Sequence, residues 1–113
     1  MTRPQIKVLD KLWSDRVRSL GRCEKCGTTQ RLTAAHIVSR RHRSTRWDLR
    51  NGICLCYRCH MFWAHNDPVE FVEWVRSTRG DALLFELQKT SRDITLCKSI
   101  DFDEIRQQLG EGK

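Results

Sequence analysis

The sequence lacks any apolar run of about eighteen residues, the length that a membrane-spanning helix needs. Its first residues are polar and include Pro4, so the apolar segment of a secretory signal peptide is also missing. We therefore expect no membrane association and a cytoplasmic location. Cysteines stay reduced there, and six of them in a chain of 113 residues favour metal binding over a disulfide scaffold.

Acidic side chains are nearly missing from residues 31–58, which hold seven arginines and one acid, Asp48. This segment thus carries +6 of the formal net charge of +7. Such a run can be an ordinary solvated surface. The planar guanidinium of arginine, however, suits bidentate phosphate contacts, and these arginines surround a group of cysteines and histidines. The pattern predicts a nucleic-acid backbone as partner, with contacts from Arg40, Arg41, Arg43 and Arg46.

Two Cys-x2-Cys pairs form the most specific motif, Cys23 with Cys26 and Cys56 with Cys59. Each pair has the spacing with which proteins hold a tetrahedral zinc ion, and four thiolates leave no open position for catalysis. We therefore predict a structural Zn²⁺ site; separately buried or redox-active cysteines are the alternative. Cys54 and Cys97 are expected to be small buried residues outside this site.

The periodicity predicts one α+β domain over residues 1–113, with an N-terminal helix, a zinc-held core and C-terminal helices at 4–20, 22–66 and 67–110. Within the core we expect a strand at 31–38, an arginine-rich loop at 39–50 and a second strand at 51–55, which begins with the turn residues Asn51-Gly52. A helix is expected to follow at 57–65. Asp67, Pro68 and Glu70 predict a capping box for a helix that Gly80 ends. Helices are also expected at 81–91 and 101–109, and a loose tail at the last few residues.

The order His36, Asn51, His60 in "AHI…RNGICLCYRCH" resembles the motif of HNH endonucleases, which have the ββα-metal fold. Three longer segments are similar to the NinG/Rap group of phage and prophage recombination endonucleases: "LDKLWSDRVRSLGRCEKCG", "SRRHRSTRWDLRN" and "FVEWVRSTRGDALLFEL". The resemblance implies that His36 is the general base for the attacking water. It further implies that Asn51 bridges the loop and that His60 binds a catalytic divalent cation.

Two positions near this motif bear on the catalytic cation. His65 is a second candidate ligand, although its five-residue distance from His60 fits a helix less well than three or four residues. Many HNH enzymes have an aspartate ligand where this sequence has Ala35. A site of imidazole and water would accept Mn²⁺ as well as Mg²⁺.

These features favour a metal-dependent DNA endonuclease with low sequence specificity, because phosphate contacts carry no sequence information. The resemblance implies products with a 5′-phosphate and a 3′-hydroxyl, branched recombination intermediates as substrate, and a phage or prophage origin in a bacterial cell. A homodimer would suit paired nicks, although no sustained heptad predicts one. The main alternative is a zinc-stabilised DNA-binding module without catalysis, and a third is a zinc domain for protein interaction.

Overall fold

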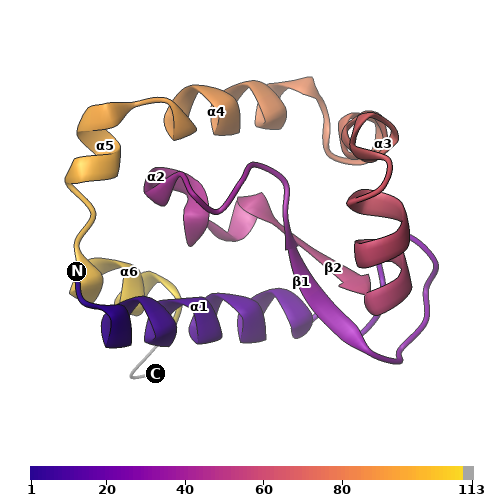
Figure 1. Cartoon of the computed structure of the whole chain (residues 1–113), viewed down its shortest axis with the longest axis horizontal. Coiled ribbons are helices and arrows are strands. Elements are labelled where there is room, and N and C mark those ends of the chain that lie inside the picture. The colour runs from indigo at the N-terminus through magenta and orange to yellow at the C-terminus, as the bar shows by residue number, and fades with distance from the viewer. Residues whose placement is uncertain (111–113) are drawn as a thin grey trace.

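The chain is built around a two-stranded antiparallel hairpin, with helices on several sides of it (Figure 1). The computed structural model describes residues 1–110; residues 111–113, part of the predicted tail, lie outside the described residues. Strands β1 (Leu32–His36) and β2 (Gly52–Cys56) pair so that Leu32 lies opposite Cys56 and His36 opposite Gly52. Every residue of β2 is buried, which explains its apolar "ICLC" run.

Helix α1 (Arg3–Arg18) begins at a capping box formed by Thr2 and Gln5, and it packs on both strands. Its contact with the hairpin depends on Gly52, because a Cβ atom there would lie 2.9 Å from Trp13 Cζ2 and closer still to Val17. Gly52 closes a turn at the start of β2, as expected, because its amide donates to the Leu49 carbonyl oxygen. Its backbone is extended (φ −114°, ψ 140°), and the missing side chain serves close packing.

The predicted loop at 39–50 contains two short helical segments, α2 (Arg43–Arg46) and the 3₁₀ helix η1 (Leu49–Asn51). Residue periodicity did not predict these two segments, because they are polar and too short to show an apolar stripe. Long-range contacts hold them in place. Thr45 is fully buried, and the Ser44 hydroxyl donates to the Thr90 carbonyl oxygen at 2.7 Å.

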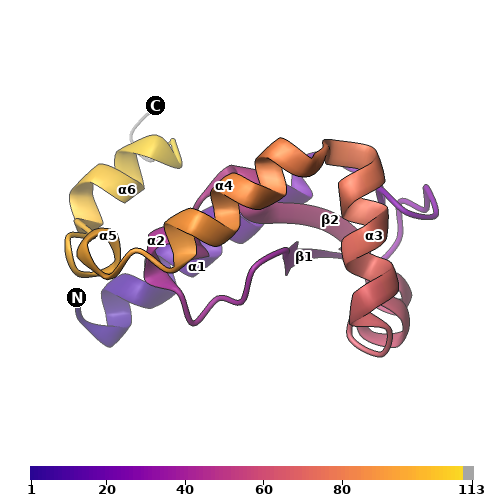
Figure 2. The same ribbon diagram turned by 90° about the horizontal axis from the view of Figure 1, so that it is seen from above.

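The second half of the chain is helical, with η2 (Cys59–Ala64), α3 (Pro68–Arg79), α4 (Asp81–Ser91), α5 (Ile94–Lys98) and α6 (Phe102–Gln108). Figures 1 and 2 show α3 beside the hairpin, while α4 packs on α2 and α3. Asp67 caps α3 as predicted, but Glu70 completes no capping box, because its carboxylate accepts from the Trp63 indole. The sequence analysis missed α5. Within residues 1–110, no helix is both long and apolar enough to cross a membrane.

Buried side chains form two clusters. The hairpin core joins the strands to η2, α3 and α4, and consists of Cys23, Ala35, Ile53, Leu55, Cys56, Ala64, Phe71, Val75 and Leu84. The helix core lies between α1, α2 and α6 and consists of Leu9, Trp13, Trp47 and Leu109. Cys54 is buried, as expected, while Cys97 is half-buried.

Candidate active site

The four paired cysteines meet at one point beside the hairpin. The sulfur atoms of Cys23, Cys26, Cys56 and Cys59 all lie within 4.8 Å of one another. Cys26 Sγ and Cys56 Sγ, from different pairs, are 3.7 Å apart. Four sulfurs at zinc–sulfur distances of about 2.3 Å in a tetrahedron would be separated by about 3.8 Å. The cluster is therefore compatible with structural zinc.

Backbone amides and burial act in opposite directions on the thiols of this cluster. The amides of Cys26 and Cys59 point at the sulfurs of Cys23 and Cys56, each at 3.5 Å. Burial opposes ionisation of Cys23, but hydrogen bonds from backbone amides outweigh it and lower the pKa of this thiol to about 6. At Cys59, burial and the neighbouring cysteines both raise the pKa. A dication bound by all four sulfurs would favour the thiolate form of Cys59 as well, because it would balance the negative charge.

His60 lies on η2 with one ring nitrogen fixed. Its Nδ1 is 2.9 Å from the Thr33 hydroxyl, which itself donates to the Leu55 carbonyl oxygen at 2.6 Å. Since the hydroxyl proton is used there, Thr33 accepts the Nδ1–H of His60. The Nε2 lone pair is left free, which suits a metal ligand. Burial, followed by the charges of His65 and His36, lowers the pKa of His60, so the ring is neutral at pH 7.

His65 lies next to His60 because η2 is a π-helix. The His65 amide donates to the His60 carbonyl oxygen, a bond that spans five residues. The wider turn brings positions five apart onto one face, and the two ring centroids lie 4.7 Å apart. The five-residue spacing is a poor match for an α-helix, as the sequence analysis noted, but it suits a π-helix.

His36 is held at the end of β1 by a backbone carbonyl and an indole. Its Nε2 lies 2.9 Å from the Arg46 carbonyl oxygen, which can only accept, so Nε2 carries the proton and Nδ1 keeps its lone pair. Trp13 stacks on the imidazole at 4.0 Å between ring centroids. Burial lowers the pKa of His36. The hydrogen bond to the Arg46 carbonyl and the charge of Asp10 raise this pKa, while the positive charges of Arg46 and Arg40 lower it. The net shift is downward, and the imidazole is neutral at pH 7.

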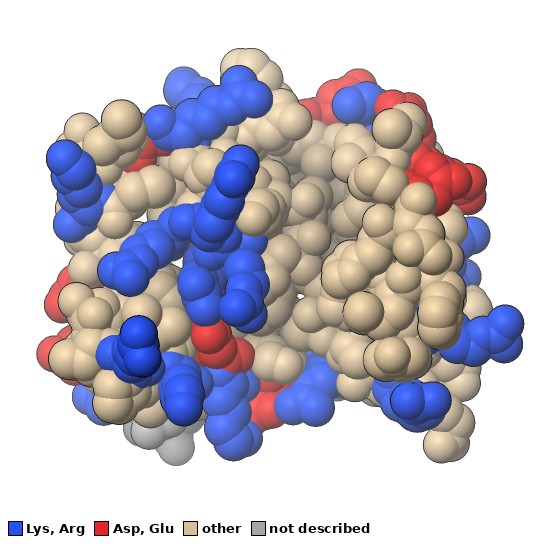
Figure 3. Space-filling model, viewed as in Figure 1, with Lys and Arg blue, Asp and Glu red and all other residues tan. Residues whose placement is uncertain are grey.

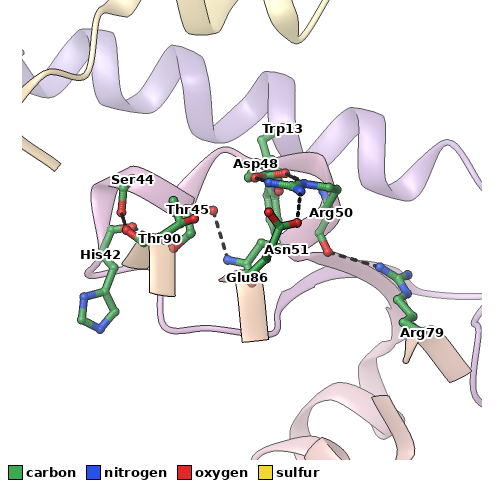
Figure 4. A network of polar contacts seen from close by, with 10 residues as sticks. All are labelled: Trp13, His42, Ser44, Thr45, Asp48, Arg50, Asn51, Arg79, Glu86 and Thr90. Carbon is green, nitrogen blue, oxygen red and sulfur yellow. Dashed lines mark hydrogen bonds and ion pairs between the residues drawn. The ribbon is translucent and has the colours of Figure 1, made fainter. Parts of the chain in front are cut away.

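Asn51 joins the two ends of the segment between the strands. Its fully buried amide accepts from the Val38 amide at 2.8 Å, and it donates to the carbonyl oxygens of Val38 and Thr45 at 3.1 Å. Figure 4 shows the bond to Thr45 among neighbouring contacts that include Arg50 with Asp48. The arrangement fixes the backbone that follows β1 against the start of β2.

One cleft of about 730 Å³ contains the three imidazoles described above. His36 reaches it from β1, and His60 and His65 reach it from η2. Asp10, Trp13, Ala35 and Arg40 also line it. Within residues 1–110, the four cysteines are the only cluster of three or more potential ligands, so the cleft offers a cation few protein atoms.

Residues 23–67 match the family model for HNH endonucleases. We call them the HNH segment; it contains the four cysteines, both strands, η2 and the three cleft histidines. Searches among curated proteins and among solved structures gave no match to the chain. The family match supports nuclease activity and DNA as a partner, and it leaves α1 and α3–α6 outside.

The arginines of the HNH segment fall into two groups. Arg40, Arg41 and Arg43 are exposed, and Arg40 lines the cleft. Figure 3 shows lysine and arginine side chains gathered over α2, beside a hollow lined mostly by uncharged residues. Arg46 differs, because its side chain is only 15% exposed and is bound to Asp10 by two hydrogen bonds of 3.0 and 2.8 Å.

Three residues that position the cleft histidines were not found by sequence analysis: Thr33 and Trp13 contact His60 and His36, and Asp10 acts through Arg46. Thr33 is an ordinary strand residue in the sequence and carries no signal of its contact with His60. Asp10 and Trp13 lie on α1, and their spacing there is that of an ordinary amphipathic helix. No local signal distinguishes them, since their partners lie more than twenty residues away in sequence.

Proposed function

We propose that this protein is a divalent-metal-dependent endonuclease that hydrolyses DNA phosphodiester bonds. The observation that carries the proposal is a pair of oriented imidazoles in one cleft. His36 has a free Nδ1 and His60 a free Nε2, because hydrogen bonds fix the opposite nitrogen of each ring. Fixed tautomers of this kind suit a general base and a metal ligand, respectively.

His36 is the general base in this proposal. Its neutral Nδ1 takes a proton from the water that attacks phosphorus, and the lowered pKa keeps that lone pair available at neutral pH. The Arg46 carbonyl and the Trp13 ring prevent the imidazole from turning. Asn51 holds the connecting backbone, so that this geometry does not have to be recovered in each turnover.

His60 and His65 would hold the catalytic cation. Two imidazoles and a neighbouring Ala35 in place of a carboxylate favour Mn²⁺ over Mg²⁺, with oxygen ligands supplied by the DNA phosphate and water. When bound, the cation supplies charge that polarises the phosphate and stabilises the leaving 3′-oxygen. Cleavage would then give a 5′-phosphate and a 3′-hydroxyl.

The structural assignments follow the same proposal. Strands β1 and β2 with η2 would form the ββα-metal core, within one domain over residues 1–113. The four cysteines would hold Zn²⁺ and fix the turn at residues 23–26 to the start of η2, which carries His60. Zinc would therefore support the cleft without taking part in hydrolysis, because all four positions are protein thiolates.

DNA would be bound mainly through its phosphates, by Arg40, Arg41 and Arg43. Such contacts give low sequence specificity. We assign Arg46 a positioning role, because its guanidinium is bound to Asp10. The resemblance alone supports four further parts of the proposal. These are branched recombination intermediates as substrate, a phage or prophage origin, a place in the bacterial cytoplasm and a homodimer for paired nicks.

A zinc-stabilised DNA-binding module without catalysis is the second candidate. Ala35 favours it, because the cleft lacks the carboxylate that many HNH enzymes place there. It explains the cysteines and the exposed arginines equally well. It gives no reason, however, for two half-buried imidazoles that line one cleft, each with one ring nitrogen fixed by a hydrogen bond.

Nicking of supercoiled plasmid separates these two functions. Freshly purified protein would be incubated with plasmid and with branched DNA in Mn²⁺, Mg²⁺ or EDTA. We expect nicking with Mn²⁺, weaker nicking with Mg²⁺ and none with EDTA. The His36→Ala variant, purified in the same way, is the control for contaminating nuclease. Protein that binds DNA but leaves every substrate intact in each metal would be the binding module.

A further inference from the structure

The helix α1 lies outside the HNH segment, yet it supplies two contacts to the residues around His36. Asp10 binds the Arg46 guanidinium through both carboxylate oxygens, Oδ1 to Nε at 3.0 Å and Oδ2 to Nη2 at 2.8 Å. Asp10 Oδ1 also accepts from the Trp47 indole at 2.9 Å. One helical turn later, Trp13 covers the face of the His36 ring.

We propose that Asp10 is a positioning residue for DNA cleavage, acting through Arg46 on the ring of His36. This inference rests on the proposed function, because it assigns Asp10 to the same reaction. Arg46 connects the two groups. Its side chain is held by Asp10, and its main-chain carbonyl oxygen accepts the Nε2–H of His36 at 2.9 Å.

The segment that carries this carbonyl needs an external anchor. Helix α2 has only four residues, and its cap residue, His42, makes no side-chain capping bond. A helix of one turn has almost no stability of its own, so tertiary contacts fix its backbone. The bidentate pair between Asp10 and Arg46, together with the Trp47 indole, ties α2 to α1. Losing it would let the carbonyl move and His36 change its tautomer or ring plane.

The position of Asp10 also argues against a role in DNA binding. Asp10 lines the cleft. Burial raises the pKa of its carboxyl, but hydrogen bonds from Arg46 and Trp47 and the charges of Arg46 and Arg40 outweigh burial and keep this pKa below its usual range. An ionised carboxylate in a phosphate-binding cleft repels DNA. Removing that charge should therefore leave DNA affinity equal or higher while turnover falls, a combination that loss of a DNA contact would not give.

The test uses Asp10→Asn in the full chain, with Asp15→Asn as matched control. Asp15 lies on the same helix but pairs with Lys11 and Arg18 at the surface, so the control removes the same charge from α1 without touching α2. Plasmid nicking in Mn²⁺ gives kcat and KM for each protein. We expect kcat to fall about ten- to a hundredfold for Asp10→Asn with KM unchanged or lower, and no change for Asp15→Asn.

A spectroscopic readout tests the position of His36 directly. Ring ¹⁵N NMR of the histidines should show His36 as a single tautomer protonated at Nε2 in the wild-type protein and in Asp15→Asn. Asp10→Asn should give a mixture of tautomers. Arg46→Lys keeps the charge but loses the two-bond geometry, so it should give the same mixture of tautomers as Asp10→Asn. If the pair acts as a unit, the double variant Asp10→Asn with Arg46→Lys should lose no more kcat than either single variant.

The outcomes separate the two proposals. An unchanged kcat and an unchanged His36 tautomer in folded Asp10→Asn would overturn the role of Asp10 while leaving the endonuclease proposal intact. Wild-type protein that never cuts DNA would overturn the endonuclease proposal. The tautomer measurement needs no cleavage, so it would still decide whether Asp10 fixes His36.

Discussion

The hairpin core and the helix core stabilise the two sides of the cleft in different ways. On the hairpin side, two cysteine pairs 30 residues apart in sequence converge on one point, and the second pair leads directly into η2 with His60 and His65. On the helix side, His36 depends on Trp13 and on the pair between Asp10 and Arg46, which joins residues 36 positions apart. A cysteine cluster that is compatible with structural zinc thus lies beside one group of histidines, and packing between distant segments supports the other.

This difference determines how each side should respond to change. Metal binding is nearly all-or-none, because removing one ligand releases an ion on which the fold of that region depends. Packing and ion pairs contribute smaller and separable amounts of free energy. Substitutions on the hairpin side should therefore affect the whole fold, and those on the helix side should mainly affect the alignment of His36.

The largest effect is expected from Cys26→Ser. Cys26 is exposed, so the substitution costs little packing and reports on the metal. Structural zinc sites contribute about 10 kcal/mol or more, comparable to the whole stability of a small domain. Elemental analysis should show one zinc per wild-type chain and none in the variant, and circular dichroism should show loss of cooperative unfolding.

Cys97→Ser is the matched control for that experiment. Cys97 is half-buried and lies outside the cluster, where its thiol contacts the Ser44 hydroxyl. It should keep both zinc and the unfolding transition. Wild-type protein without zinc, or a Cys26→Ser variant that unfolds like the wild type, would show that the four thiols do not hold a structural ion.

The next largest effect separates the two histidine groups. His36→Ala should keep zinc, fold and DNA affinity but lose cleavage by about 10²–10⁴-fold, the usual cost of removing a general base. His60→Ala should lose cleavage because the catalytic cation binds more weakly, so raising Mn²⁺ should restore part of it. Plasmid nicking over a range of Mn²⁺ concentrations measures both.

His42→Ala serves as the control, because His42 makes no side-chain capping bond and does not line the cleft. Its nicking rate should equal that of the wild type. If Mn²⁺ restores His36→Ala and not His60→Ala, the roles assigned to the two imidazoles are reversed.

Sequence alone revealed much of the hairpin side and little of the helix side. The cysteine pairs and the order of His36, Asn51 and His60 are local patterns, and caps such as Asp67 marked helix starts. The pair between Asp10 and Arg46 has no local sign, because each residue is an ordinary surface type until folding brings α1 against α2. The neighbouring positions of His60 and His65 depend on a π-helical turn, which residue spacing alone does not indicate.

A smaller effect on the helix side is expected from Gly52→Ala. The added methyl group would meet Val17 and Trp13, the indole that stacks on His36. Overpacking of this kind costs about 1–3 kcal/mol. Thermal unfolding should show a lower midpoint, and kcat should fall because Trp13 no longer lies flat on the imidazole, while zinc content stays unchanged.

The variant Gly52→Ala with Val17→Ala tests that explanation. Removing the Val17 methyl groups makes room for the new Cβ, so part of the stability and of the kcat should return. A double variant that is simply less stable by the sum of both changes would mean that Val17 does not oppose the Cβ, and that the cost at Gly52 has another origin.

The smallest expected effect concerns the exposed arginines. Arg40→Ala with Arg41→Ala should weaken DNA binding for all sequences, because each removed phosphate contact lowers the slope of log affinity against log salt by about 0.9. Fluorescence anisotropy at several salt concentrations, in the His36→Ala background that prevents cleavage, measures this slope.

Arg18→Ala with Arg76→Ala is the control with equal loss of charge, since Arg18 is bound to Asp15 and Arg76 to Glu73 and Asp81. Equal slopes for both double variants would show that general charge attracts the DNA. A lower slope for Arg40 and Arg41 alone would place the phosphates beside the cleft, on the side where the helix core holds His36.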